Sequence, residues 1–127
     1  MARALSYSVR DNPGGYESCA EDLMQYISKK PFQVDQCIYR RAVDTASDTV
    51  ADSTTRIECP LVPLKDNPLR FNGTTILLAG EVTGSAAVSL AAAFQCFGVG
   101  PVVGSETGGA TVCHGNPLHI RLPRTGQ

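Results

Sequence analysis

The chain contains one serine whose position suits acyl-transfer chemistry. Ser85 lies in the segment EVTGSAA, residues 81–87, where an apolar run of strand length gives way to a helical pattern. A serine at the first turn of a helix presents its hydroxyl at a loop tip, beside backbone N–H groups that the helix leaves unpaired and that can hold an oxyanion. The same position suits a plain helix N-cap, and on position alone capping is the commoner role.

A second loop with the same placement contains Gly14 and Gly15. It follows a short β-forming run, residues 5–9, and precedes a helical pattern. Paired glycines allow positive φ and close approach to a ligand, so one N–H can supply the other half of an oxyanion hole. A strand-to-helix turn would also use them. Because two donors must both reach one oxygen at about 3 Å, we expect Ser85 within about 6 Å of this loop.

Alternating strand and helix patterns must position both loops. Residues 74–79 form a nearly continuous apolar run, which predicts a central strand covered on both faces. Residues 85–97 are almost free of polar side chains, which predicts a buried helix with Gln95 as the exception. The alternation predicts an α/β layered domain with a mostly parallel sheet. The remaining expectations are a helix at 16–28, strands at 5–9, 34–39, 102–103 and 118–122, and a surface loop at 44–55.

Composition and charge exclude several functional classes. The 127 residues fit a single domain, and 43% hydrophobic with 18% charged residues is ordinary for a folded protein. Eleven basic against twelve acidic side chains give a formal charge of -1, so we expect no nucleic-acid partner. The longest apolar stretch, residues 86–97, is too short to span a bilayer, and the first residues show no secretory signal pattern.

The five cysteines do not predict a metal site, because none of them forms a CxxC pair or another metal-ligand spacing. We expect neither zinc nor an organic cofactor. Cys19 and Cys96 fall on predicted helices and are expected to be buried free thiols. Cysteine usage leaves the compartment open.

Four segments, in this order, resemble the tail-specific (C-terminal processing) and tricorn-core serine peptidases: RDNPGG at 10–15, NG at 72–73, TGSAA at 83–87 and VVGSETGG at 102–109. The resemblance implies a fold related to ClpP and crotonase. It implies Ser85 as nucleophile and the N–H groups of Gly15 and Ala86 as oxyanion donors. It also implies a peptide or protein substrate and no cofactor, is compatible with self-association, and slightly favours an extracytoplasmic setting.

The chain departs from the family pattern at its proton acceptor. The serine–lysine branch carries a lysine at the position of Ala110, so that branch is excluded as an active form. The tricorn-like branch uses a histidine upstream of the strand that ends in Arg10 and an acidic residue downstream of the segment that ends here. Two further acidic positions of the family correspond to Ser8 and Val88. We therefore expect little or no peptidase activity from these residues alone.

Other roles remain open at this stage. His114 follows the glycine loop at residues 104–109 and is a candidate substitute base if the chain folds back toward Ser85, whereas His119 alternates with apolar residues and is expected to be a surface or structural residue. Glu106 is expected to be a solvated loop carboxylate. Retinoid-binding modules of the interphotoreceptor protein contain similar segments, so a non-catalytic module for retinoids or fatty acids is one rival. A crotonase-type acyl-CoA enzyme, which needs no serine nucleophile, is another.

Overall fold

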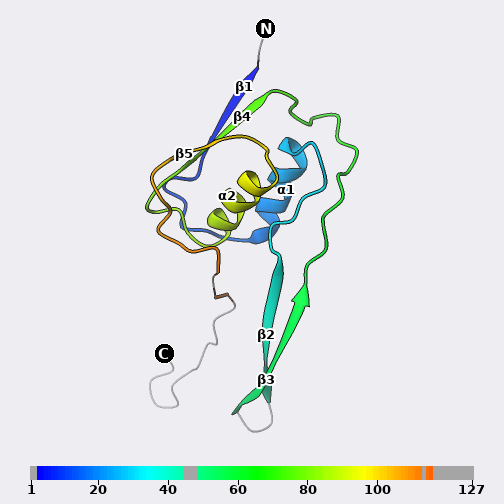
Figure 1. Cartoon of the computed structure of the whole chain (residues 1–127), viewed down its shortest axis with the longest axis vertical. Coiled ribbons are helices and arrows are strands. Elements are labelled where there is room, and N and C mark those ends of the chain that lie inside the picture. Colours follow the sequence, from blue (N-terminus) through cyan, green and yellow to red (C-terminus); the bar gives the residue numbers. More distant parts are fainter. Residues whose placement is uncertain (1–2, 45–48, 113, 116–127) are drawn as a thin grey trace, which may run out of the picture.

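The chain forms a small α/β body from which a β-hairpin projects (Figure 1). The computed structural model describes residues 3–44, 49–112 and 114–115. The elements in chain order are β1 (Ala4–Ser8), α1 (Glu17–Ile27), β2 (Cys37–Asp44), β3 (Thr49–Glu58), β4 (Thr74–Ala79), α2 (Ala86–Cys96) and β5 (Val102–Gly104). The expected strand at 118–122 lies outside the described residues. No helix in the described part of the chain has the length and apolarity needed to cross a membrane.

Strand β4 is the centre of a parallel three-stranded sheet, as predicted, and the strand order is β1–β4–β5. Ser8 of β1 lies opposite Leu78, and Val103 of β5 lies opposite the same residue on the other side. Because the strands are parallel, their carboxyl ends share one edge of the sheet. The Gly14–Gly15 loop follows β1, the Ser85 loop follows β4 and the glycine loop follows β5, so this edge gathers all three motifs.

The core lies between one face of this sheet and the two helices. Thr75, Leu77 and Ala79 alternate along β4 and are buried, while Ile76 and Leu78 on the other face are only partly buried. The prediction that both faces are covered was therefore half right. The helices pack against each other, and α2 also contacts β4 and β5. The buried hydrophobic cluster comprises Val9, Ala20, Met24, Ile27, Phe32, Leu77, Ala79, Ala87, Leu90, Ala91, Ala93 and Phe94.

Helix α2 is almost wholly buried, as its sequence predicts. Eight of its eleven residues are buried and Gln95 is exposed. Its alanines allow close packing on the sheet and on α1. The prediction of buried thiols was wrong, because Cys19 and Cys96 are both exposed. Cys19 precedes the buried Ala20 by one position, about 100° around α1, and Cys96 falls in the last turn of α2.

The segment 44–55 was expected to be a surface loop, and this prediction was also wrong. Most of it belongs to an antiparallel hairpin of β2 and β3, with a register shift between Arg41 and Val43. The expected strand at 34–39 likewise begins only at Cys37 and runs to Asp44. The described side chains of β3 are exposed, so this strand lacks the buried alternation by which a sequence pattern reveals a strand.

Candidate active site

The loops that follow β1 and β4 meet at Ser85. A Cβ atom added to Gly14 would lie 2.5 Å from the Cβ of Ser85, 2.9 Å from the carbonyl oxygen of Gly84 and 3.1 Å from the Ser85 hydroxyl oxygen. No side chain fits in that space, and Gly14 also has a φ of 121°, which L residues rarely adopt. The expected proximity of Ser85 to this loop is confirmed.

Ser85 does not act as a helix cap. It stands at the N-cap position of α2, but its side chain makes no capping hydrogen bond. Its φ of 46° and ψ of -129° differ from the extended backbone of ordinary N-caps, and no other non-glycine residue in the described part of the chain has a positive φ. Such a conformation costs about 1–3 kcal/mol and is concentrated at functional sites. The exposed hydroxyl is therefore left for another role.

Two backbone N–H groups beside Ser85 have no acceptor among the described residues. The N–H of Gly14 donates to Asn12 Oδ1 at 2.9 Å, but the next N–H, that of Gly15, makes no such bond. The N–H of Ala86 is equally unpaired, because Ala86 is the first residue of α2. These are the two groups that the sequence singled out as oxyanion donors.

The glycine loop after β5 packs against the Ser85 loop. A Cβ on Gly109 would lie 3.0 Å from the Cα of Gly84 and 3.3 Å from the backbone nitrogen of Ser85. The N–H of Gly109 donates to the carbonyl of Thr83 at 3.1 Å. Ala110 follows directly and is exposed. Ala110, which we expect at the position of the family's lysine, is therefore the next residue after a glycine that packs against the Ser85 loop.

No base contacts the Ser85 hydroxyl in the described part of the chain. Among the described residues, no hydrogen bond joins Ser85 Oγ to His114 or to Glu106, and both of these residues are exposed. His119 lies outside the described residues. The described residues therefore supply the site with a serine hydroxyl and two N–H groups that have no acceptor among them.

Two polar residues of the site were missed in the sequence. Asn12 holds the first loop, since its side chain accepts the Gly14 N–H and its carbonyl accepts the Gly84 N–H at 3.1 Å. Thr83 is completely buried although it lies in a loop. The sequence feature that could have indicated Asn12 is an Asn-Pro turn directly before two glycines. The feature that could have indicated Thr83 is a hydroxyl residue directly before Gly84.

A carboxyl group with an altered pKa stands near the first loop. Glu17 begins α1, two residues after Gly15. A hydrogen bond with Asp35, burial, and the negative charges of Asp35 and Glu21 raise the pKa of Glu17 from 4.5 to about 7, against a smaller lowering by a hydrogen bond with Ser89. The first residue of α1, two residues after Gly15, therefore carries a carboxyl group with a pKa near neutral pH.

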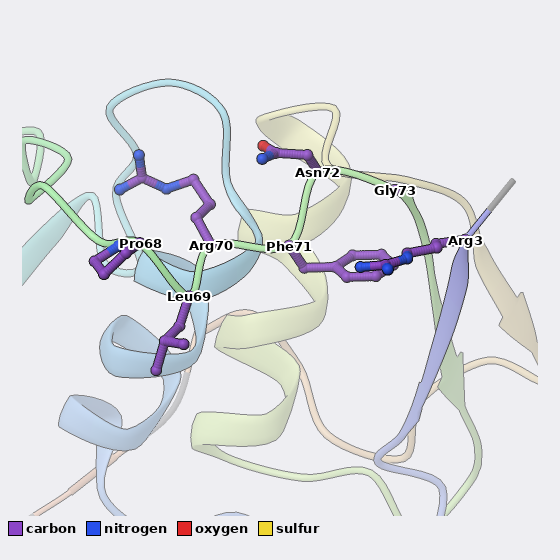
Figure 2. Close-up of a pocket in the computed structure, with 7 residues that line it drawn as sticks. All are labelled: Arg3, Pro68, Leu69, Arg70, Phe71, Asn72 and Gly73. Carbon is purple, nitrogen blue, oxygen red and sulfur yellow. The ribbon is translucent and has the colours of Figure 1, made fainter. Parts of the chain in front are cut away.

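A hollow of about 620 Å³ lies at the opposite edge of the sheet (Figure 2). The carbonyl of Arg3 accepts the N–H of Thr74, which places this hollow at the amino end of β4, whereas Ser85 follows the carboxyl end. Figure 2 shows the side chains of Arg3 and Arg70 extending in different directions. The lining residues are Arg3, Pro68, Leu69, Arg70, Phe71, Asn72 and Gly73. Because its two cations do not converge, this hollow is a weaker candidate site.

A comparison with known protein families found a match to this chain. The family model described as peptidase family S41 matches residues 8–117, a range that includes all three loops at the carboxyl edge of the sheet. A search of curated proteins found no match.

Proposed function

Because the chain belongs to peptidase family S41, a family of serine peptidases, we propose that it cleaves peptide bonds through an acyl-enzyme on Ser85. The contact between Ser85 and Gly14 is the observation that carries this proposal, since it brings an uncapped hydroxyl to the loop of the second oxyanion donor. We further propose that the fold is ClpP/crotonase-like and that the enzyme is of the tricorn-like type, because Ala110 stands at the lysine position.

In the proposed reaction, Ser85 Oγ attacks the carbonyl carbon of the scissile peptide bond and loses its proton to a base. The carbonyl oxygen becomes an oxyanion, which accepts hydrogen bonds from the N–H groups of Gly15 and Ala86. Collapse of this intermediate breaks the C–N bond, and the leaving amine takes the proton from the base. Water then attacks the acyl-enzyme by the same route and releases Ser85.

The proton acceptor is the part of this scheme that the described residues do not supply. A serine hydroxyl is a weak nucleophile until a base accepts its proton. We propose that the base is a histidine outside the described residues, as in the tricorn-like branch, and that His114 becomes the first candidate only if Ser85 reacts rapidly without it. Loss of one triad member leaves roughly a 10³- to 10⁴-fold acceleration over water, so Ser85 without a base should react slowly.

Covalent labelling tests the nucleophile directly. The chain is incubated with an alkyl fluorophosphonate, and the adduct is located by mass spectrometry. We expect slow, substoichiometric labelling confined to Ser85, none in Ser85→Ala, and unchanged labelling in Ser105→Ala, which removes an exposed serine of the glycine loop. Equal labelling of the parent and Ser85→Ala would contradict the proposal. Retention of a retinoid or fatty acid without labelling would favour a binding module instead.

A gain-of-function variant tests the missing base. Ala110→Lys places an amine where serine–lysine members of the family carry theirs, and Ala110→Met adds similar bulk without an amine. We expect Ala110→Lys to label Ser85 about tenfold faster than the parent at alkaline pH, with Ala110→Met unchanged. Equal rates in the two variants would place residue 110 out of reach of the Ser85 hydroxyl.

A further inference from the structure

Thr83 is a completely buried polar residue between β4 and the nucleophile loop. Its hydroxyl donates to the carbonyl of Val9 at 2.8 Å and accepts the N–H of Gly80 at 2.9 Å. Its backbone N–H donates to the carbonyl of Gly80 at 2.9 Å, and its own carbonyl accepts the N–H of Gly109 at 3.1 Å. One side chain and its backbone therefore bond to the ends of β1 and β4 and to the glycine loop.

The Val9 carbonyl is the point from which the first loop departs. The N–H of Val9 continues the sheet by donating to Leu78 at 2.8 Å, and its carbonyl also accepts the N–H of Asn12 at 3.1 Å. Asn12 in turn orients Gly14 through its side chain. A hydroxyl that donates a hydrogen bond to the Val9 carbonyl therefore fixes the position at which the loop containing Gly15 begins.

We propose that Thr83 is a positioning residue whose hydroxyl sets the separation between the Gly15 and Ala86 N–H groups. The catalytic consequence rests on the proposed function of Ser85. The two N–H groups belong to loops that are distant in sequence, so their separation depends on bonds between those loops. The second such bond joins the Gly84 N–H to the Asn12 carbonyl on an exposed residue. The Thr83 hydroxyl is fully buried, so water cannot readily replace it.

The position of the hydroxyl also argues against a purely local role. Thr83 lies two residues before the N-cap Ser85, and its hydroxyl bonds to Gly80 and Val9 and to none of the helix N–H groups. Its bond to Val9 spans 74 positions in sequence. A displacement of about 1 Å between the reacting groups can cost a factor of about 100 in rate, so a small change in this bond is amplified at the site.

The test compares Thr83→Val, which removes the hydroxyl with little change in shape, with Thr83→Ser, which keeps it. The matched control is Ser28→Ala, because Ser28 is equally buried and its hydroxyl donates to the Lys30 carbonyl at 2.7 Å at the far end of α1. The readouts are the rate of Ser85 labelling by an alkyl fluorophosphonate, the ¹H–¹⁵N amide signals of Gly15 and Ala86, and the melting temperature.

We expect Thr83→Val to slow labelling at least about tenfold and to shift both amide signals. Thr83→Ser should keep the parent signals and label within about threefold of the parent rate. Ser28→Ala should lower the melting temperature without changing labelling or either signal. Should Thr83→Val fail to fold, Thr83→Ala takes its place in the comparison with Thr83→Ser.

A folded Thr83→Val with the parent labelling rate and unmoved Gly15 and Ala86 signals would overturn the proposal. So would equal shifts in Thr83→Val and Ser28→Ala. If Ser85 is not labelled in any variant, the proposed function fails, but the two amide signals still decide whether Thr83 positions the donors.

Discussion

The carboxyl edge of the sheet and the β2–β3 hairpin differ in how their chain segments pack. At the sheet edge, three loops approach so closely that a Cβ on Gly14 would collide with Ser85 and a Cβ on Gly108 with the carbonyl of Glu81. Among the described residues, β2 and β3 of the hairpin form a sheet only with each other, and Tyr39, for example, is 65% exposed. At the sheet edge, the positions of the loops therefore depend on buried residues and on glycines that have no side chain. The described part of the hairpin depends on neither.

This difference has a consequence for the tolerance of each region to substitution. The sheet edge includes a strained Ser85, a buried Thr83 and several glycines whose replacement meets backbone atoms. The hairpin stem contains the exposed pair Ile38 and Ile57, which face each other across the two strands. Stability and labelling should therefore respond strongly to changes around the sheet edge and weakly to changes in the hairpin.

The largest effect should follow a charge placed in the core beneath the site. Ala91 is 7% exposed on α2, so Ala91→Asp buries an unpaired carboxylate and should unfold the domain or nearly so. The control is Thr54→Asp in the hairpin, an exposed residue opposite Arg41, which should change the free energy of unfolding by less than about 0.5 kcal/mol. Chemical denaturation measures both. A folded Ala91→Asp that melts within a degree or two of the parent would refute the packing described for α2.

Two glycine substitutions with smaller expected effects should distinguish close contact with Ser85 from backbone strain as the reason for glycine at position 14. Gly14→Ala places a Cβ 2.5 Å from that of Ser85, at a φ of 121°. Gly98→Ala meets no atom within 4 Å, at a φ of 63°. We expect Gly98→Ala to cost about 1 kcal/mol and leave labelling unchanged. Gly14→Ala should cost more than about 2 kcal/mol and slow labelling of Ser85 about a hundredfold.

Denaturation curves and labelling rates of the two glycine variants make this comparison. Equal losses in both variants would mean that backbone conformation, and not the contact with Ser85, makes glycine necessary at position 14.

The same physical difference explains what the sequence could predict. Residues 74–79 were located with their observed bounds because burial shows as a continuous apolar run. The meeting of Ser85 with Gly14 was predictable because close approach requires glycine. The β3 strand was missed because its described side chains have no buried face. Thr83 was missed because its partner Val9 is distant in sequence, and only the folded chain brings them together.

The smallest expected effect is a pH dependence of stability that arises beside the first loop. The hydrogen bond with Asp35, burial and nearby negative charges raise the pKa of Glu17 from 4.5 to about 7 in the folded chain. Between these two values the folded state binds a proton that the unfolded state releases, so stability falls as pH rises through this window. Because Glu17 is only half-buried, solvent screening should reduce the effect to about 1 kcal/mol.

Glu17→Gln mimics the protonated carboxyl, so it should match the parent near pH 4.5 and exceed its stability by about 1 kcal/mol at pH 8. Asp22→Asn is the control, because Asp22 is exposed on the same helix, is not among the groups that raise the pKa of Glu17, and changes the charge by the same amount. Urea denaturation at several pH values between 4 and 9 measures the three proteins. A Glu17→Gln curve parallel to that of the parent across this range would show that the carboxyl does not retain its proton near neutral pH. A gain confined to Glu17→Gln would instead locate the titration beside the Gly15 loop, since Glu17 is the first residue of the helix that follows it.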